Sequence, residues 1–386
     1  MKEIRTAGRL NSISKSAIRK IFDAKPEDAI NLGLGEIQIP TPDKIRNYAQ
    51  KILKTGYISY TSNAGDRELI YKIKQYYEVE SEQDVCVTVG AEEALFISIL
   101  SYVEAGDEVL IPNPGFVAYE SIINIAGGSA IKFDLNPENG FRVDLDDLRV
   151  KVNSRTKMIV FSNPSNPLGT SLNQQEFDLF LEIARKSDII LLVDEIYREL
   201  YHIERPDTFL AKQQNVIVVS GLSKSHCMTG WRIGWAIGAA KLIAPLITLH
   251  QYVCTCASYL SQKTAIFALS AEGMKEKEII RTALCENYKY LEMRFKQELP
   301  ELELLNPAAS PYLFFKIGKE EDRYVEALSK AGIITLPGII FGSNGKGWIR
   351  LSYGLERHIL ERALDRIVPV IKILHKLNQK ISGEGE

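Results

Sequence analysis

The chain has 386 residues, and its 47 basic and 49 acidic side chains give a formal net charge of −2. Hydrophobic residues make up 45% and charged residues 25% of the chain, which is typical of globular proteins and excludes collagen-like, coiled-coil and disordered chains. A nearly neutral chain has no strong field to attract nucleic acid or an anionic membrane, so we expect neither as a partner.

Hydropathy and cysteine content point to the cytoplasm. No stretch of about 18 apolar residues occurs, and the charged N-terminus lacks the apolar segment of a secretory signal. None of the five cysteines forms a C-x-x-C pair, and the sparse histidines suggest no metal framework around Cys254 and Cys256. We therefore expect free thiols in a reducing compartment and no metal site.

Short apolar runs alternate with helical patterns through the middle of the chain, at 85–89, 108–111, 157–162, 189–193 and 216–220. Continuous apolar strands separated by helices predict an α/β fold whose mostly parallel sheet is covered on both faces. Polar, glycine-containing segments follow these strands, at Gly90, 163–169, 194–197 and 221–224. Because the carboxyl ends of parallel strands meet at one edge, we expect these segments to line one crevice.

The pattern changes toward the C-terminus, where a long helical stretch over 271–298 precedes a strand, a helix over 322–330 and a last amphipathic helix. These elements predict a smaller α+β domain, which the N-terminal residues join through a helix over 14–21. We place an N-terminal arm and part of the small domain at 1–40, the large domain at 41–285 and the small C-terminal domain at 286–386.

The segment 220–234, SGLSKSHCMTGWRIG, carries the most informative chemistry. Lys224 follows a buried strand and becomes a nucleophile if desolvation or a nearby positive charge lowers its pKa. Arg232 follows eight residues later, and its planar fork suits a phosphate. A lone loop lysine is usually a solubility feature, so this interpretation depends on the neighbouring motifs.

The segment VDEIY places Asp194 at the end of an apolar strand. A buried carboxylate needs a cationic partner, such as a protonated pyridine nitrogen. Tyr197 presents its hydroxyl to the same ligand if the chain has entered a helix. The alternative for Asp194 is a simple helix N-cap.

Two further turns belong to the same predicted edge. Asn166, in NPSNPLGT, can donate its amide to a ring oxygen or to a carboxylate, although a plain β-to-α turn explains the segment equally well. Gly90 opens a helix, whose N-terminal amides and dipole favour an anion.

Taken together, these motifs resemble those of fold-type I pyridoxal-phosphate-dependent aminotransferases of the aspartate aminotransferase class I/II family. The similarity runs from NLGLGEIQIPTP (31–42) through YTSNAGDREL (60–69) to GWIRLSYG (347–354). The lysine motif and HQYVCTCASYLSQK (250–263) resemble a bacterial branch of aromatic, aspartate and acetyl-diaminopimelate aminotransferases. This resemblance implies a large domain with a seven-stranded type of sheet.

The resemblance implies roles for individual residues, with pyridoxal 5′-phosphate as the cofactor. Lys224 matches the lysine that binds the cofactor covalently, Asp194 matches the partner of the pyridine nitrogen, and Tyr197 and Asn166 match the pair at the ring 3-oxygen. The other implied cofactor ligands are Gly90, Ala91, Glu92, Phe116, Ser223, Arg232 and Tyr60. Gly35, Asn166 and Arg350 match the substrate site, where the arginine binds the α-carboxylate.

Some positions depart from the family pattern. Gly221 stands where many relatives have serine, and Ser223 is the expected substitute at the phosphate. Tyr60 matches a tyrosine that reaches the phosphate in the neighbouring subunit, which implies a homodimer. Leu168 is a second departure, since it replaces the common threonine of the N-P-T-G turn, and neither it nor Gly221 removes a group that the chemistry requires.

The implied activity is an aminotransferase of the EC 2.6.1 class, acting on amino acids and 2-oxo acids. A carbon–sulfur lyase on the same fold is the alternative, because the same lysine, aspartate and tyrosine serve both reactions. A catalytically silent regulatory protein is more remote, since no DNA-binding segment precedes Asn31. The identity of the substrate side chain stays open. A second carboxylate would suit the N-terminal cations Arg5, Arg9, Lys15 and Arg19, and an aromatic ring would suit Phe116 and Tyr252.

Overall fold

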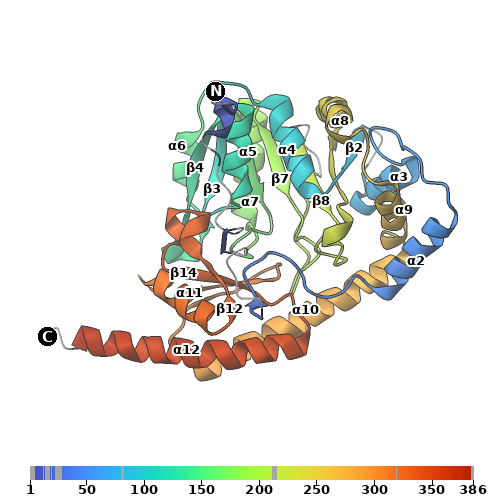
Figure 1. Ribbon diagram of the computed structural model, residues 1–386. Helices are drawn as coiled ribbons and strands as arrows, with labels where there is room; N and C mark the ends of the chain where they lie inside the picture. Colours follow the sequence, from blue (N-terminus) through green and yellow to red (C-terminus); the bar gives the residue numbers. More distant parts are fainter. Residues whose placement is uncertain are drawn as a thin grey trace.

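The computed structural model describes residues 5–11, 13, 18, 20–21, 28–79, 82–210, 215–318 and 320–383. A large sheet with helices on both faces forms one part of the molecule, and a smaller sheet with two long helices beneath it forms the other (Figure 1). No helix in the described ranges is both long and apolar enough to cross a membrane.

The large sheet has eight strands in the order β2-β9-β8-β7-β6-β3-β4-β5. They are β2 (Gln83–Thr88), β3 (Glu108–Asn113), β4 (Ser129–Asn136), β5 (Arg142–Val143), β6 (Thr156–Ser162), β7 (Ile190–Asp194), β8 (Val216–Gly221) and β9 (Gly234–Ala239). The five central strands pair in parallel in the order β8-β7-β6-β3-β4. Strand β9 is antiparallel to both of its neighbours, β2 and β8. The predicted mostly parallel sheet is confirmed, and the two-residue β5 extends it at one edge.

Burial explains which strands the sequence revealed. β3, β7 and β8 are buried along their whole length, so both faces must be apolar and the runs are continuous. β4 and β9 were not individually predicted. β4 mixes exposed and buried positions, and β9 has glycine at Gly234 and Gly238, which weakens the pattern.

Helices cover the two faces as two separate apolar layers. The core on one face includes side chains from α4 (Ala91–Tyr102), α5 (Ala118–Ala126) and α8 (Ala240–Cys254). The opposite core includes α2 (Asp43–Lys54), α3 (Arg67–Tyr77), α6 (Leu145–Lys151), α7 (Gln174–Ser187) and α9 (Tyr259–Ala268). The sheet is therefore desolvated on both sides, and its carboxyl edge is where polar side chains can gather.

The smaller part holds a four-stranded antiparallel sheet in the order β10-β11-β14-β13. Its elements are β10 (Leu304–Leu305), β11 (Tyr312–Lys316), α11 (Glu321–Lys330), β13 (Leu336–Pro337), β14 (Trp348–Ser352) and α12 (Arg357–Gly383). β1 (Ile30–Asn31) pairs in parallel with β12 (Ile333–Ile334), so an N-terminal segment joins the C-terminal elements. The predicted boundaries at 40 and 285 stay predictions, and most of the helix predicted over 14–21 lies outside the described residues.

Helix α10 (Ala271–Glu298) has the predicted bounds and links the two parts. Ile280 and Leu284 pack in a cluster with Tyr197, whereas Leu291 and Phe295 belong to the core of the smaller part. In Figure 1 this helix runs beneath both parts and alongside α12. It therefore ties the position of the small sheet to the edge of the large one.

Candidate active site

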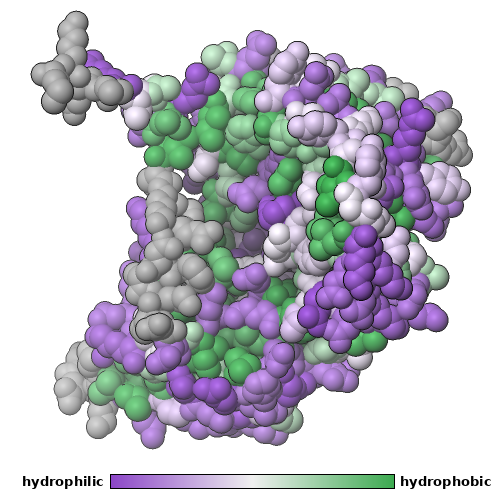
Figure 2. Space-filling view, turned by 45° about the vertical axis from the view of Figure 1, so that its right-hand side comes forward, coloured by the Kyte–Doolittle hydropathy of each residue, from purple (hydrophilic) through white to green (hydrophobic). Residues whose placement is uncertain are grey.

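A cavity of about 1020 Å³ lies where the strand ends of the large sheet face the smaller sheet. Figure 2 shows the molecule hollowed between its upper and lower parts. Most of the predicted site residues line this cavity: Gly35, Ala91, Glu92, Phe116, Asn166, Asp194, Tyr197, Ser223, Lys224, Arg232 and Arg350. Chain segments far apart in sequence therefore meet at one site.

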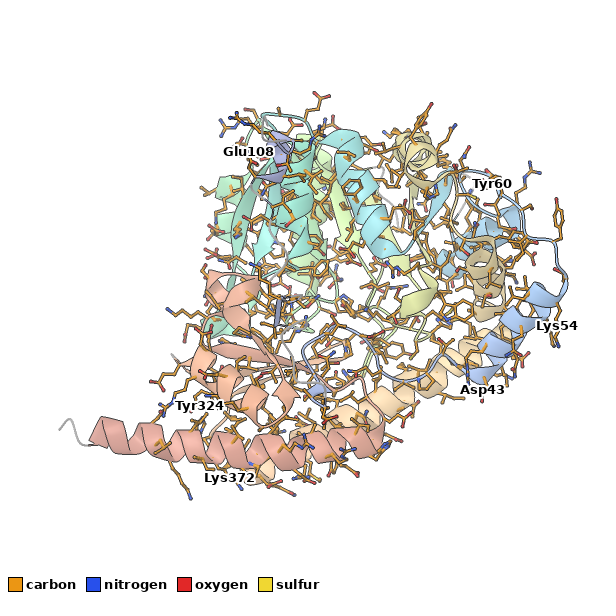
Figure 3. All side chains as sticks on the ribbon, viewed as in Figure 1. Asp43, Lys54, Tyr60, Glu108, Tyr324 and Lys372 are labelled. Carbon is orange, nitrogen blue, oxygen red and sulfur yellow. The ribbon has the colours of Figure 1, made fainter. Side chains whose placement is uncertain are left out.

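Two predicted residues are not in this lining. Gly90 lies just before it as the N-cap of α4. Tyr60 is 84% exposed, and Figure 3 shows it on the outer rim of the molecule. Within its own chain, Tyr60 does not reach the cavity.

Lys224 lies in the turns that follow β8, with its amine inside the cavity. Its Nζ donates to the carbonyl oxygen of Gly35 at 2.5 Å. Burial lowers the pKa of the Lys224 amine to about 8, although Glu36 acts in the opposite direction. The ordinary pKa of a lysine is 10.5, so near neutral pH this amine is neutral far more often than an exposed lysine is. The neutral form is the nucleophile.

Asp194 is the last residue of β7 and is 6% exposed. One carboxylate oxygen accepts from the amide of Ile196 at 3.1 Å, and no lysine, arginine or histidine of the described chain lies within ion-pair distance. Burial raises the pKa of this carboxyl to about 7. A buried carboxylate without a cationic partner is stabilised by a cationic ligand, such as a protonated ring nitrogen.

The chain after Asp194 forms consecutive turns instead of a helix, with the amide of Arg198 bonded to the carbonyl of Glu195. The helix that was the stated condition for Tyr197 to face the ligand is therefore not formed, and the helix N-cap alternative for Asp194 is wrong. Tyr197 still faces the cavity, because the turns direct its ring toward β11, where its hydroxyl lies 2.8 Å from that of Tyr312.

Arg350, on β14, is 1% exposed and its guanidinium is held in place by neutral groups. It donates to the amide oxygen of Asn166 and to the carbonyl of Gly33, both at 2.6 Å. It lies over the rings of Tyr312 and Phe341, at 4.2 and 4.8 Å from their centroids. No described carboxylate is within ion-pair distance, and its Nε has no hydrogen-bond partner in the described chain. A carboxylate ligand would satisfy this buried cation.

The N-terminus of α4 forms an anion cradle. Its first amides, at Ala91 and Glu92, have no acceptor inside the helix. Gly90 has φ 87°, and a Cβ there would lie 2.6 Å from a guanidinium nitrogen of Arg232. A Cβ at Gly234 would lie 2.5 Å from the amide of Ala91. Both glycines let backbone amides and the arginine approach one point, as a phosphate requires.

Tyr312 and Glu36 also line the cavity, and neither was predicted as a site residue. A Cβ at Gly35 would lie 2.4 Å from the Tyr312 hydroxyl, which explains why this position is glycine. Glu36 accepts from the hydroxyl of Thr229 at 2.9 Å. Glu36 directly follows Gly35, a signal available in the sequence, whereas Tyr312 lies within an apolar run that reads as core.

These groups fit pyridoxal 5′-phosphate. Asp194 suits the pyridine nitrogen, the amine of Lys224 suits the aldehyde, and the α4 cradle with Arg232 suits the phosphate. The ring of Phe116 lines the same cavity. The donor set therefore matches a phosphorylated pyridine aldehyde at each of its polar ends.

Comparisons with known proteins agree with this chemistry. Residues 27–367 match the family model described as aminotransferase class I and II. The chain is 34% identical to a putative aminotransferase YugH of Bacillus subtilis, over 95% of this chain and 97% of the relative. It is 33% identical to an aspartate aminotransferase of Pyrococcus horikoshii, over 94% and 96% of the two chains.

A solved structure shows the same fold. The aspartate aminotransferase from Thermus thermophilus with maleate aligns with a TM-score of 0.88 at 26% identity, covering 95% of this chain and all of the other. The fold, the site and the matched family together show that the chain belongs to the class I and II aminotransferases, enzymes that use pyridoxal 5′-phosphate.

Proposed function

We propose that this aminotransferase uses Arg350 to bind the α-carboxylate of an L-amino acid, whose amino group is transferred to a 2-oxo acid. The observation that carries the proposal is a buried guanidinium with neutral hydrogen-bond partners and no described counter-ion. Desolvating a cation without a partner is costly, so a fixed, buried arginine is suited to an anion that arrives with the substrate.

The cofactor, when bound, supplies the electron sink that makes loss of the substrate Cα proton feasible. In our proposal Asp194 keeps the ring nitrogen protonated, since the buried carboxylate gains a cationic partner. The neutral amine of Lys224 accepts the Cα proton as a general base, a role worth about 10²–10⁴-fold. Tyr197 and Asn166 orient the ring through its 3-oxygen.

For the substrate side chain, we infer an apolar or aromatic group. Relatives carry names that include aspartate, aromatic-amino-acid and N-acetyl-LL-diaminopimelate aminotransferase. The cations that line the cavity in the described chain are Lys224, Arg232 and Arg350, each assigned to another ligand group. Apolar side chains make up much of the remaining wall, at Ile13, Ile18, Leu34, Phe116, Ile122 and Ile125. This lining supports an aromatic substrate over a dicarboxylate.

We further propose a cytoplasmic homodimer in which Tyr60 contacts the phosphate bound by the partner subunit. Its 84% exposure and its distance from its own cavity support this role. Ile58, Tyr252 and Val253 are also unusually exposed for apolar residues, as expected of a contact surface. All five cysteines are free thiols, which supports a reducing compartment.

A single-turnover screen tests the proposed function. Each amino acid is mixed with the cofactor-bound enzyme, and the spectral change to the aminated cofactor is followed together with the released 2-oxo acid. We expect aromatic amino acids to convert the cofactor to its aminated form, and an added 2-oxo acid to restore the original spectrum. The Lys224→Ala variant should show no conversion. Pyruvate and ammonia formed from cysteine conjugates without an acceptor would instead identify a lyase.

A further inference from the structure

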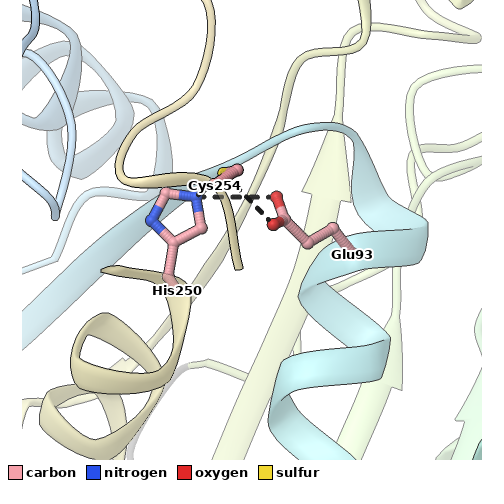
Figure 4. Close-up of side chains that lie close together, drawn as sticks. All are labelled: Glu93, His250 and Cys254. Atoms are coloured by element: carbon pink, nitrogen blue, oxygen red, sulfur yellow. Dashed lines mark hydrogen bonds and ion pairs between the residues drawn. The ribbon is translucent and has the colours of Figure 1, made fainter. Parts of the chain in front are cut away.

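Glu93, His250 and Cys254 form a compact cluster beside α4; Glu93 also lines the active-site cavity, but none of the three has been given a role in the reaction. One ligand atom of each lies within 4.8 Å of the others. Figure 4 shows the three side chains converging from the first turn of α4 and the last turns of α8. No metal site was predicted around Cys254, because the sequence has no C-x-x-C pair and few histidines. Cys254 and Glu93 are 161 residues apart, so only the fold brings them together.

The three side chains are held with their donor atoms facing one another. Nδ1 of His250 lies 2.8 Å from the carbonyl oxygen of Asn63, which can only accept, so Nδ1 carries the proton. Nε2 is therefore the nitrogen that faces the cluster. Glu93 is fixed by the amide of Val89, which donates to its Oε2 at 2.5 Å. Hydrogen bonds of this kind orient metal ligands and set the tautomer of histidine.

The spacing of the donor atoms suits a tetrahedral ion. Sγ of Cys254 lies 3.2 Å from Nε2 of His250 and 3.4 Å from Oε1 of Glu93, and Nε2 lies 3.5 Å from Oε2 of Glu93. Zinc bonds of about 2.3 Å to sulfur and about 2.0–2.1 Å to nitrogen or oxygen place tetrahedral ligands about 3.3–3.6 Å apart. The sulfur–nitrogen and sulfur–oxygen separations agree with those edges to within about 0.4 Å. The nitrogen–oxygen separation is measured to the other carboxylate oxygen, so Glu93 faces the thiol and the imidazole with both of its oxygens.

From this geometry we propose that Glu93, His250 and Cys254 bind one zinc ion, with water in the fourth position. One thiolate, one imidazole and one carboxylate form a ligand set typical of zinc. His250 is fully buried and the side chain of Glu93 is 11% exposed, so the site is enclosed yet open at Cys254, which is only partly buried. The ion would join the end of α8 to the helix turn that carries the phosphate cradle.

The experiment uses the cofactor-bound enzyme after dialysis against a chelator. Zinc affinity is measured by competition with a chromophoric chelator, and Co²⁺ is added separately as a spectroscopic probe. We expect one ion per chain and the intense visible bands of tetrahedral Co²⁺ bound to a thiolate. Cys254→Ser should weaken zinc binding by at least about 100-fold and remove the thiolate band. Cys285→Ser is the matched control, because this free thiol lies outside the cluster and donates a hydrogen bond to the carbonyl of Tyr201. It should change neither the zinc affinity nor the Co²⁺ spectrum.

Glu93→Gln provides a second test that retains both the thiol and the imidazole, and it should also weaken binding while thermal unfolding reports an intact fold. Zinc affinity weaker than about 10 μM, or equal affinity in the unchanged protein and in Cys254→Ser, would overturn the proposal. The cluster would then be a hydrogen-bonded thiol, imidazole and carboxylate. Either result is independent of transamination, because the readouts are metal binding and the Co²⁺ spectrum.

Discussion

The guanidinium of Arg350 and the amide oxygen of Asn166 are 2.6 Å apart, although the two residues are separated by 184 positions in the sequence. The contact joins β14 of the small sheet to the turn after β6 of the large sheet. A charged hydrogen bond across the two parts of the molecule fixes the arginine before any substrate binds. Such preorganisation lowers the cost of positioning the substrate.

Replacing Arg350 with leucine should lower kcat/KM for α-amino acids by about 10²–10³-fold, because charged hydrogen bonds to the α-carboxylate contribute about 1.5–3 kcal/mol each. Steady-state kinetics with a series of amino donors measures this loss. Amines that lack the carboxylate serve as the control, and their slow turnover should be unchanged. A loss of equal size with these amines would contradict the carboxylate role.

Asp194→Asn should reduce kcat at least about 100-fold, since the asparagine cannot hold the ring nitrogen protonated. The same change should stabilise the cofactor-free protein. Burial raises the pKa of the wild-type carboxyl from its ordinary value of 3.8 to about 7, so keeping it charged costs folding stability as the pH rises through that window. The cost reaches at most about 4 kcal/mol above pH 7.

Calorimetry of the two cofactor-free proteins between pH 4 and pH 8 checks the stability effect of Asp194→Asn. The melting temperature of the variant should exceed that of the wild type at pH 8, and the difference should shrink toward pH 4. A difference that is independent of pH would show that the carboxylate is not charged at a cost in the empty site.

The pKa of Lys224 predicts the pH dependence of cofactor attachment. The neutral amine is the nucleophile, so the rate at which the cofactor-free enzyme takes up pyridoxal 5′-phosphate should rise with pH and level off above about 8. Glu36 stabilises the charged amine, so Glu36→Gln should move the midpoint to lower pH. Stopped-flow absorbance at each pH measures both midpoints, and an unshifted midpoint in the variant would contradict this contribution of Glu36.

Tyr312→Phe should produce a smaller effect than Tyr197→Phe. Tyr312 supports the hydroxyl of Tyr197 at 2.8 Å, and one neutral hydrogen bond contributes about 0.5–1.5 kcal/mol, or about 2–10-fold in kcat. The pH dependence of the absorbance of the bound cofactor should differ from that of the wild type in both variants, and the difference should be larger in Tyr197→Phe. Identical kinetics and spectra for Tyr312→Phe and wild type would exclude the supporting role.

The sequence alone determined the features that depend on short stretches of chain. Continuous apolar runs predicted the central strands, and two site residues were recognisable from them: Asp194 ends such a run, and Lys224 lies in the short turn after another. The rule that parallel strands share a carboxyl edge then predicted that the polar segments meet. Helix α10 was predictable in full, since its length and polarity pattern are local properties.

Tertiary packing decided the rest. Tyr312 lies in an apolar strand, and only the approach of β11 to the turn after β7 places its hydroxyl at Tyr197, 115 residues away. Tyr197 reaches the cavity from turns and not from a helix, and its side chain packs in a cluster with Ile280 and Leu284 of α10. Glu93, His250 and Cys254 meet only because α4 and α8 cover the same face of the sheet. Contacts over such separations depend on how layers pack, which no local pattern of residues encodes.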